Sequence, residues 1–248
     1  MRHVSTILSI LILATPSFAD GLLYTLPKDG TAAHYTFKQT MTFPKKKDDP
    51  ITMKGEFTLA SVGKVKEKGK DCRWIEIVIK SEPKKNIPQT RTIIKALVPE
   101  QHIGKGKNPL KHWIRGWAKL TQQNPMQLTK DQLRQPNLLH NMFITGPLKQ
   151  TKPLKEKVID TKALGKLKCV GEKGTFILKD GVVNINNGVV TKRDAILTFE
   201  NHFHEKSPFG VVKGLFRMDG GKDQAKAEAV LMLDRIETKA KSLLPERK

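Results

Sequence analysis

The stretch CRWIEIVIKSE, residues 72–82, decides the fold class of this 248-residue chain. Apolar side chains alternate with polar ones through Ile75, Ile77 and Ile79, and β-branched residues dominate. Alternation with a period of two predicts a strand that buries one face. We therefore expect a half-buried β-strand here and a sheet around it.

Three neighbouring stretches repeat this alternation. Residues 33–43 carry it through Ala33, Tyr35 and Phe37, and residues 51–65 and 90–98 follow the same pattern. Polar segments rich in proline, glycine, lysine and aspartate separate these stretches and are typical of turns; they are residues 27–30, 44–50, 66–71 and 83–89. Four strands at this spacing predict an antiparallel meander.

Strand patterns return in the second half of the chain. They cover residues 155–164, 167–178, 188–203 and 209–220, with an Asn-Asn-Gly turn signal at 186–188. The final segment, 222–245, fits either a helix by propensity or one more strand by its alternating alanines and leucines. We take the strand, because segments that are neighbours in sequence usually pair.

The middle of the chain changes period. In NPLKHWIRGWAKL, residues 108–120, Asn108 is a suitable N-cap and Pro109 a suitable first helical residue. An apolar stripe follows at helical spacing, made by Leu110, Trp113, Trp117 and Leu120. A second, weaker helical stretch runs from 129 to 143. The stripe predicts either core packing against the sheet or a lid whose residues bind an apolar ligand.

These patterns define the expected fold class. We expect an α+β protein that is mostly β, with a single curved antiparallel sheet, half-barrel-like, and a central helical insertion packed on its concave face. No internal repeat or linker marks a boundary, so residues 20–248 form one domain.

The first nineteen residues form a signal peptide. Arg2 precedes an apolar run, Val4–Ala14, and Ser17-Phe18-Ala19 supplies small residues at a cleavage point before Asp20. No cysteine follows that point, so a lipid anchor there is not expected. No later segment reaches the length of a membrane-spanning helix. We expect export through the secretory pathway, to the periplasm or the outside.

Export decides how the two cysteines are interpreted. Cys72 and Cys169 are the only cysteines, and an oxidising compartment favours a disulfide between them. Such a bridge stabilises by about 4 kcal/mol in the chain-entropy model. The alternative is a pair of buried free thiols.

The chain is strongly basic. Lysine and arginine number 45 against 24 acidic residues, a formal charge of +21. This balance is typical of proteins with anionic partners, but lysine dominates and is spread along the chain, so a solvated basic surface is the simpler interpretation. Nucleic acid is not an expected partner, because the sequence has no aromatic-rich basic motif.

Motifs for catalysis and cofactors are mostly absent from the sequence. It contains no GxSxG, HExxH or Cys-x-x-Cys pattern, so no catalytic residue can be named and no cofactor is expected. GKGKNP, residues 104–109, has the composition of an anion-binding loop but matches no phosphate motif. His202 and His204 share one face if their strand is extended, yet a metal site needs further ligands, so we expect two outward-facing histidines and no metal.

Four short motifs resemble exported, uncharacterised proteins of planctomycete-type bacteria. They are GLLYTLPKDGT at 21–31, NPLKHWIRGWAKL at 108–120, SPFGVVKGLF at 207–216 and AKSLLP at 240–245. The resemblance implies export and a β-rich fold and brings no activity. The PFG turn into a valine-rich strand is also similar to one in half-barrel lipid-binding proteins of the lipoprotein-carrier kind, an analogy of fold alone.

Three functions are compatible with the sequence. The favoured one is an exported, non-enzymatic binding protein for an amphiphile or an anionic envelope polymer. The others are an envelope structural or interaction module without a small-molecule ligand, and an extracellular hydrolase. An apolar cavity favours the first, a filled core with an exposed apolar patch the second, and a cleft with facing carboxylates the third.

Overall fold

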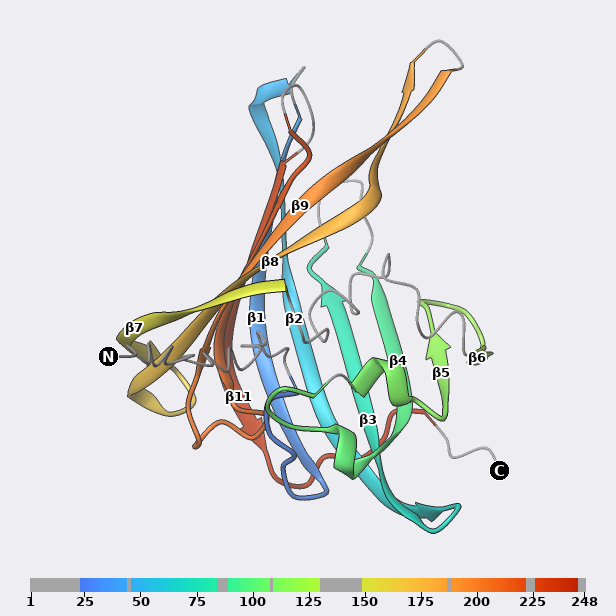
Figure 1. The fold of residues 1–248 in the computed structure, drawn as a ribbon. Coiled ribbons are helices and arrows are strands. Elements are labelled where there is room, and N and C mark those ends of the chain that lie inside the picture. The colour runs from blue at the N-terminus through green and yellow to red at the C-terminus, as the bar shows by residue number, and fades with distance from the viewer. Residues whose placement is uncertain are drawn as a thin grey trace, which may run out of the picture.

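The computed structural model describes residues 23–43, 46–83, 89–107, 109–129, 149–186, 189–221 and 226–244. These residues form one antiparallel sheet of eleven strands (Figure 1). Its strands and two short 3₁₀ helices are β1 (Thr31–Phe43), β2 (Lys46–Glu67), β3 (Lys70–Ser81), β4 (Arg91–Pro99), η1 (Glu100–His102), η2 (Pro109–His112), β5 (Arg115–Lys119), β6 (Met126–Leu128), β7 (Lys149–Thr161), β8 (Gly165–Asn186), β9 (Val189–Phe203), β10 (Val211–Asp219) and β11 (Lys226–Glu237).

The strand order places β6 and β7 at the two edges of the sheet. The order is β6-β5-β4-β3-β2-β1-β11-β10-β9-β8-β7, so every neighbouring pair is consecutive in sequence except β1 and β11. All ten pairings are antiparallel. Ten reversals leave the two edge strands, β6 and β7, running in the same direction. These edges therefore cannot complete an antiparallel ring.

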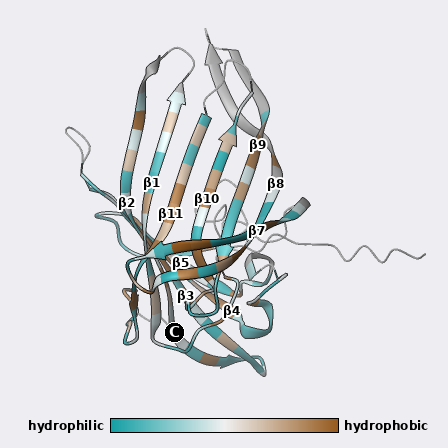
Figure 2. Ribbon diagram, turned by 90° about the vertical axis from the view of Figure 1, so that its left-hand side faces the viewer, coloured by the Kyte–Doolittle hydropathy of each residue, from teal (hydrophilic) through white to brown (hydrophobic). Residues whose placement is uncertain are grey.

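Side chains alternate between two faces of this sheet, as the banded hydropathy of the strands shows in Figure 2. One face, which we call the core face, carries Tyr35 and Phe57 on β1 and β2. Leu23, which precedes β1, packs into the same cluster, as do Ile103, Trp113 and Phe209 from connecting segments. The core face is therefore covered by the chain's own connections.

The opposite face is covered by the end of the chain, and we call it the tail face. Trp74, Leu97 and Trp117 are buried there together with Leu244. The tail runs from residue 238 to 244, and its Ala240 N–H donates to the Gly30 carbonyl at 2.8 Å. This connection holds the tail against the turn that precedes β1.

The strand predictions are confirmed across both halves of the chain. The strands expected around residues 33–43, 72–82 and 90–98 correspond to β1, β3 and β4, and the ambiguous last segment contains a strand, β11. Residues 187 and 188 lie outside the described part, but Asn186 and Val189 on either side are paired, as a hairpin requires.

The predicted α+β class is wrong, because the central helix does not form. Among the described residues there is no α-helix: Pro109–His112 is a 3₁₀ turn, and Arg115–Lys119 is strand β5, paired with β4. A four-residue spacing is also a multiple of two, so an apolar stripe at i and i+4 fits a strand as well as a helix. Most of the second expected helix, 129–143, lies outside the described residues.

The predicted disulfide does not form in this structure. Both cysteines are buried free thiols. Cys72 packs with Trp74 on the tail face, whereas Cys169 belongs to a separate cluster with Ile159, Leu167 and Val212. Burial raises the pKa of both thiols. The alternative of two buried thiols is the arrangement observed.

Candidate functional site

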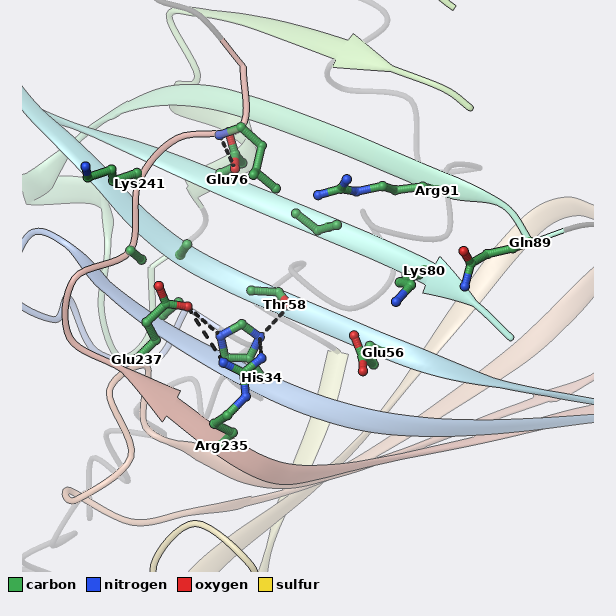
Figure 3. A pocket seen from close by; sticks show the side chains of 15 residues that line it. His34, Glu56, Thr58, Glu76, Lys80, Gln89, Arg91, Arg235, Glu237 and Lys241 are labelled. Carbon is green, nitrogen blue, oxygen red and sulfur yellow. Dashed lines mark hydrogen bonds and ion pairs between the residues drawn. The ribbon is translucent and has the colours of Figure 1, made fainter. Parts of the chain in front are cut away.

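A trough of about 390 Å³ opens on the tail face (Figure 3). Strands β1, β2, β3, β4 and β11 and the tail contribute its lining. Apolar side chains form part of the wall, among them Val78 and Leu243. The polar lining residues are His34, Glu56, Thr58, Glu76, Lys80, Gln89, Arg91, Arg235, Glu237 and Lys241.

The tail wall of the trough is anchored by two buried charged residues. Glu76 on β3 and Lys95 on β4 are cross-strand partners, 1% and 0% exposed. The Glu76 carboxylate accepts hydrogen bonds from Ser242 Oγ at 2.8 Å and from the Leu243 N–H at 3.0 Å. Lys95 Nζ donates to the Leu244 carbonyl at 3.2 Å. Both charges are therefore used to dock the tail, and the trough's wall is a built part of the fold.

An imidazole occupies the β1–β11 side of the trough. His34 Nε2 lies 3.2 Å from Glu237 Oε2, and His34 Nδ1 lies 2.9 Å from Thr58 Oγ1 and 3.2 Å from Arg235 Nη2. A carboxylate only accepts and a guanidinium only donates, so Nε2 carries the proton and Nδ1 accepts. Burial, followed by the charge of Arg235, lowers the pKa of His34, and Glu237 opposes this shift. The ring is therefore neutral at pH 7.

Thr58, His34 and Glu237 form a hydroxyl, imidazole and carboxylate series. In hydrolases such a series activates the hydroxyl as a nucleophile. Here Arg235 donates to the same Nδ1 lone pair that would accept the Thr58 proton, and Thr58 lies in the middle of a long strand. The arrangement therefore orients polar side chains and does not single out Thr58 as a nucleophile.

Like charges are paired directly across strands beside and within the trough. Lys80 on β3 is the register partner of Arg91 on β4, and Lys38 on β1 is the partner of Lys54 on β2. Glu56 lies on the same face of β2 as Lys54 and pairs with Lys80 on β3, so both like-charge pairs lie on the tail face. We call these four residues, Lys38, Lys54, Lys80 and Arg91, the basic quartet. Like charges directly opposite one another destabilise a sheet by up to about 1 kcal/mol per pair.

Another pair shows how the fold relieves such repulsion. Lys64 and Arg73 are also cross-strand partners, and both reach Glu100, at 3.8 Å and 2.7 Å. Within the described part of the chain, no member of the basic quartet takes part in an ion pair. The quartet is thus a group of four cations without an ion pair among the described residues, although Lys80 has Glu56 as its register partner on β2.

The residues predicted to bind a ligand are not brought together. Trp113 packs into the core-face cluster, and Trp117 packs on the tail face, 5.5 Å from Trp74 between ring centroids. Leu120 follows β5 and is 42% exposed. The Leu110 side chain lies outside the described set. The two tryptophans therefore lie on opposite faces of the sheet.

The two histidines of NHFHE differ from the expectation that both face outward. His202 is 3% exposed, its Nδ1 has no hydrogen-bond partner, and burial lowers its pKa. His204 accepts a hydrogen bond at Nδ1 from the Lys206 N–H at 3.1 Å. Where residues are described, no group of three or more histidine, cysteine or acidic side chains could hold a metal ion.

The loop at GKGKNP is a local turn. The Lys107 N–H donates to the Gly104 carbonyl at 3.1 Å, and Gly104 and Gly106 both have positive φ. Residue 108 lies outside the described set, and the segment after it is a four-residue 3₁₀ helix. The long helix whose N-terminus was expected to complete an anion site is not formed.

Comparisons with known proteins give limited similarity. No family model and no curated protein matches the sequence. Among solved structures, a DUF1329 family protein from Desulfovibrio piger shares 10% identity over 85% of this chain and 86% of that one, with a TM-score of 0.30. A beta-barrel-like DUF1849 protein from Brucella abortus shares 9% identity over 86% and 98%, with a TM-score of 0.28.

At these values neither likeness carries an argument about function. The resemblance to exported planctomycete-type proteins finds no support in these comparisons. Among the described residues no helix is long and apolar enough to cross a membrane. The basic quartet and the trough therefore have to be interpreted from their own chemistry.

Proposed function

We propose that this protein is an exported, non-enzymatic binding protein whose ligand is anionic. The ligand lies on the tail face, over the basic quartet and into the trough. Export is supported by the signal-like pattern of residues 1–19. The observation that carries the proposal is that two like-charge pairs without an ion pair to any described residue, Lys80–Arg91 and Lys38–Lys54, lie on neighbouring strands within and beside the trough.

The energetic argument concerns what four unpaired cations do for the folded protein. Each like-charge pair makes the sheet less stable, so folding gives no reason for the arrangement. An anion lying between the two side chains of a pair turns repulsion into two attractions. Arg91 can present two parallel N–H groups to a carboxylate, sulfate or phosphate, and Lys80 adds a point charge.

The basic and amide groups of the trough fit the same ligand, and its carboxylates Glu76 and Glu237 are already engaged, by the tail and by His34. Gln89, Lys241 and Arg235 supply further hydrogen-bond donors around the cavity. The tail wall is held by Glu76 and Lys95, so this side of the trough is formed before a ligand arrives. An anionic ligand is favoured over an amphiphile, because the amphiphile hypothesis depended on a helical lid that the fold replaces with β5.

The test is calorimetric titration of the mature protein with dextran sulfate, a soluble polyanion. Lys80→Gln combined with Arg91→Gln should weaken binding by about tenfold, since each exposed charge contact contributes about 0.7 kcal/mol and 1.4 kcal/mol is tenfold. The matched control combines Lys152→Gln with Lys173→Gln, another cross-strand lysine pair on β7 and β8. Lys173 has Glu200 as its other strand partner, just as Lys80 has Glu56, so the control pair differs from Lys80–Arg91 in lying away from the trough.

The control removes the same formal charge from a similar setting, so it measures the general effect of net charge. It should change affinity by less than about twofold. Equal losses in the two double variants would overturn the proposal, because binding would then follow net charge alone.

A further inference from the structure

We infer that Lys38–Lys54 and Lys80–Arg91 are two subsites of one extended site for a soluble acidic glycan chain whose charged sugars are separated by uncharged ones. The inference rests on the proposed function and names its ligand class. It depends on the spacing of the two pairs, on the carboxylate between them and on the hydroxyl groups around them.

The spacing of the two pairs follows from the register. The midpoint of Lys38–Lys54 lies between β1 and β2, and that of Lys80–Arg91 lies between β3 and β4, one paired step further along the strands. Two strand spacings of about 4.8 Å and one two-residue step of about 6.8 Å separate the midpoints by about 12 Å. One small anion would have to gather four cations at one point, at a cost in repulsion and side-chain entropy. A chain with an anionic group at each pair avoids both costs.

Among the described residues, Glu56 supplies a carboxylate between the two subsites, and Glu82, whose N–H donates to the Lys54 carbonyl at 2.8 Å, lies beside Lys54. Glu56 on β2 is the partner of Lys80 on one side and of Thr36 on the other, and its side chain is exposed. A polymer with a charge on every unit would place one of its anions against Glu56. A chain with an uncharged unit between charged ones places hydroxyl groups there, and a carboxylate accepts hydrogen bonds from hydroxyls.

Threonines surround the quartet on the same face. Thr36 is the register partner of Glu56 on β1, Thr58 is the next residue on the same face of β2, and Thr40 pairs with Thr52 beside Lys38 and Lys54. The hydroxyls of Thr36, Thr40 and Thr52 can donate and accept, and Thr58, which donates to His34 Nδ1, can still accept, which suits the hydroxyl groups of a sugar. A single-stranded nucleic acid would favour aromatic platforms for its bases, and Trp74 and Trp117 on this face are buried beneath the tail. The composition of the surface therefore favours a glycan.

The experiment compares hyaluronan oligosaccharides, in which a carboxylated sugar alternates with an uncharged one, by calorimetry with the full mature protein. The disaccharide has one carboxylate and should bind weakly. Oligosaccharides long enough to reach both subsites should bind on the order of 100-fold more tightly, because the second contact becomes intramolecular. Lys38→Gln combined with Lys54→Gln should abolish this gain and leave disaccharide binding within twofold.

Three further arms make the result decisive. Glu56→Gln should raise affinity for fully charged oligogalacturonate more than for hyaluronan, because it removes the carboxylate between the subsites. The Lys152→Gln, Lys173→Gln control should keep the full dependence on chain length. An oligonucleotide of equal charge should bind more weakly than a hyaluronan oligosaccharide that reaches both subsites, and tighter binding would overturn the glycan assignment.

The outcomes separate this inference from the proposed function. Equal affinity for short and long hyaluronan, with loss only in the Lys80, Arg91 double variant, would overturn the two-subsite inference and leave an anion site in place. Dextran sulfate affinity that stays unchanged when the quartet residues are substituted would overturn the proposed function itself.

Discussion

Replacement of Glu76 by alanine tests whether the tail is docked by buried charge. Glu76 lies on β3 beneath the tail, 1% exposed, with the fully buried Lys95 as its cross-strand partner. Its carboxylate accepts from the Ser242 hydroxyl and from the N–H groups of Leu243 and Leu244, at 2.8, 3.0 and 3.3 Å. Alanine removes the acceptor from all three and leaves the Lys95 ammonium buried without this carboxylate.

The magnitude follows from the cost of removing a buried charged group whose cross-strand neighbour, Lys95, is also charged and buried. Removing one partner typically costs about 3–5 kcal/mol, because the other charge stays buried. A hydrogen bond to a charged group contributes about 1.5–3 kcal/mol, so the three bonds are consistent with this range. For a protein of this size 1 kcal/mol corresponds to about 2–4 °C, so the midpoint should fall by about 6–20 °C.

The assays are thermal melting, which gives the midpoint in °C, and guanidinium denaturation, which gives the free energy of unfolding; both are followed by tryptophan fluorescence, because Trp74 and Trp117 lie in the cluster that Leu244 closes. Glu56→Ala is the control, since Glu56 is exposed on the same face, and it should change stability by no more than about 0.5 kcal/mol. Glu76→Gln keeps the size and one acceptor oxygen, so its loss should be intermediate. A loss below 1 kcal/mol in Glu76→Ala would refute the anchoring role of the buried carboxylate.

Three further predictions concern pH, backbone and thiols. Burial lowers the pKa of both His34 and His202, so below about pH 6.5 the unfolded chain binds more protons than the folded chain. The denaturation midpoint should therefore be lower at pH 5 than at pH 7.5. An equal or higher midpoint at pH 5 would contradict this. Gly210→Ala should lower the free energy of unfolding by about 1–3 kcal/mol, because φ is +86° and the new Cβ would lie 2.7 Å from the Tyr24 ring. Gly165→Ala is the control: φ is +65° there but the space around the new Cβ is open, so the loss measured in the same way should be smaller. Cys72 and Cys169 should react with a thiol reagent only after denaturation without reductant, and both should then titrate; no reactive thiol would indicate the disulfide that the structure lacks.

The strands could be predicted because their signal is local. Ile75, Ile77 and Ile79 alternate within one segment, and β-branched residues favour extended backbone whatever they pair with. The same alternation indicates which side chains share a face, so Lys54, Glu56 and Thr58 could be assigned to one side of their strand from the sequence.

The central segment could not be predicted for a physical reason. Trp113 and Trp117 are four residues apart, which fits one face of a helix and also fits alternate positions in a strand. Pairing of Trp117 with Lys95 on β4 decides between them, and that hydrogen-bonding partner is about twenty residues away in sequence. Propensity is a weak influence compared with a strand edge that offers unpaired N–H and C=O groups.

The sequence by itself determined a basic, strand-rich chain with a signal-like N-terminus and an outward-facing set of lysines. Only the tertiary structure decided that Lys38 faces Lys54, that Lys80 faces Arg91 and that residues 238–244 form a wall over Glu76. Alternation fixes the face of a side chain, but a neighbour across a strand depends on register. A shift of one residue would place the whole set on the other face, and the register is set by burial of the core-face side chains along the sheet.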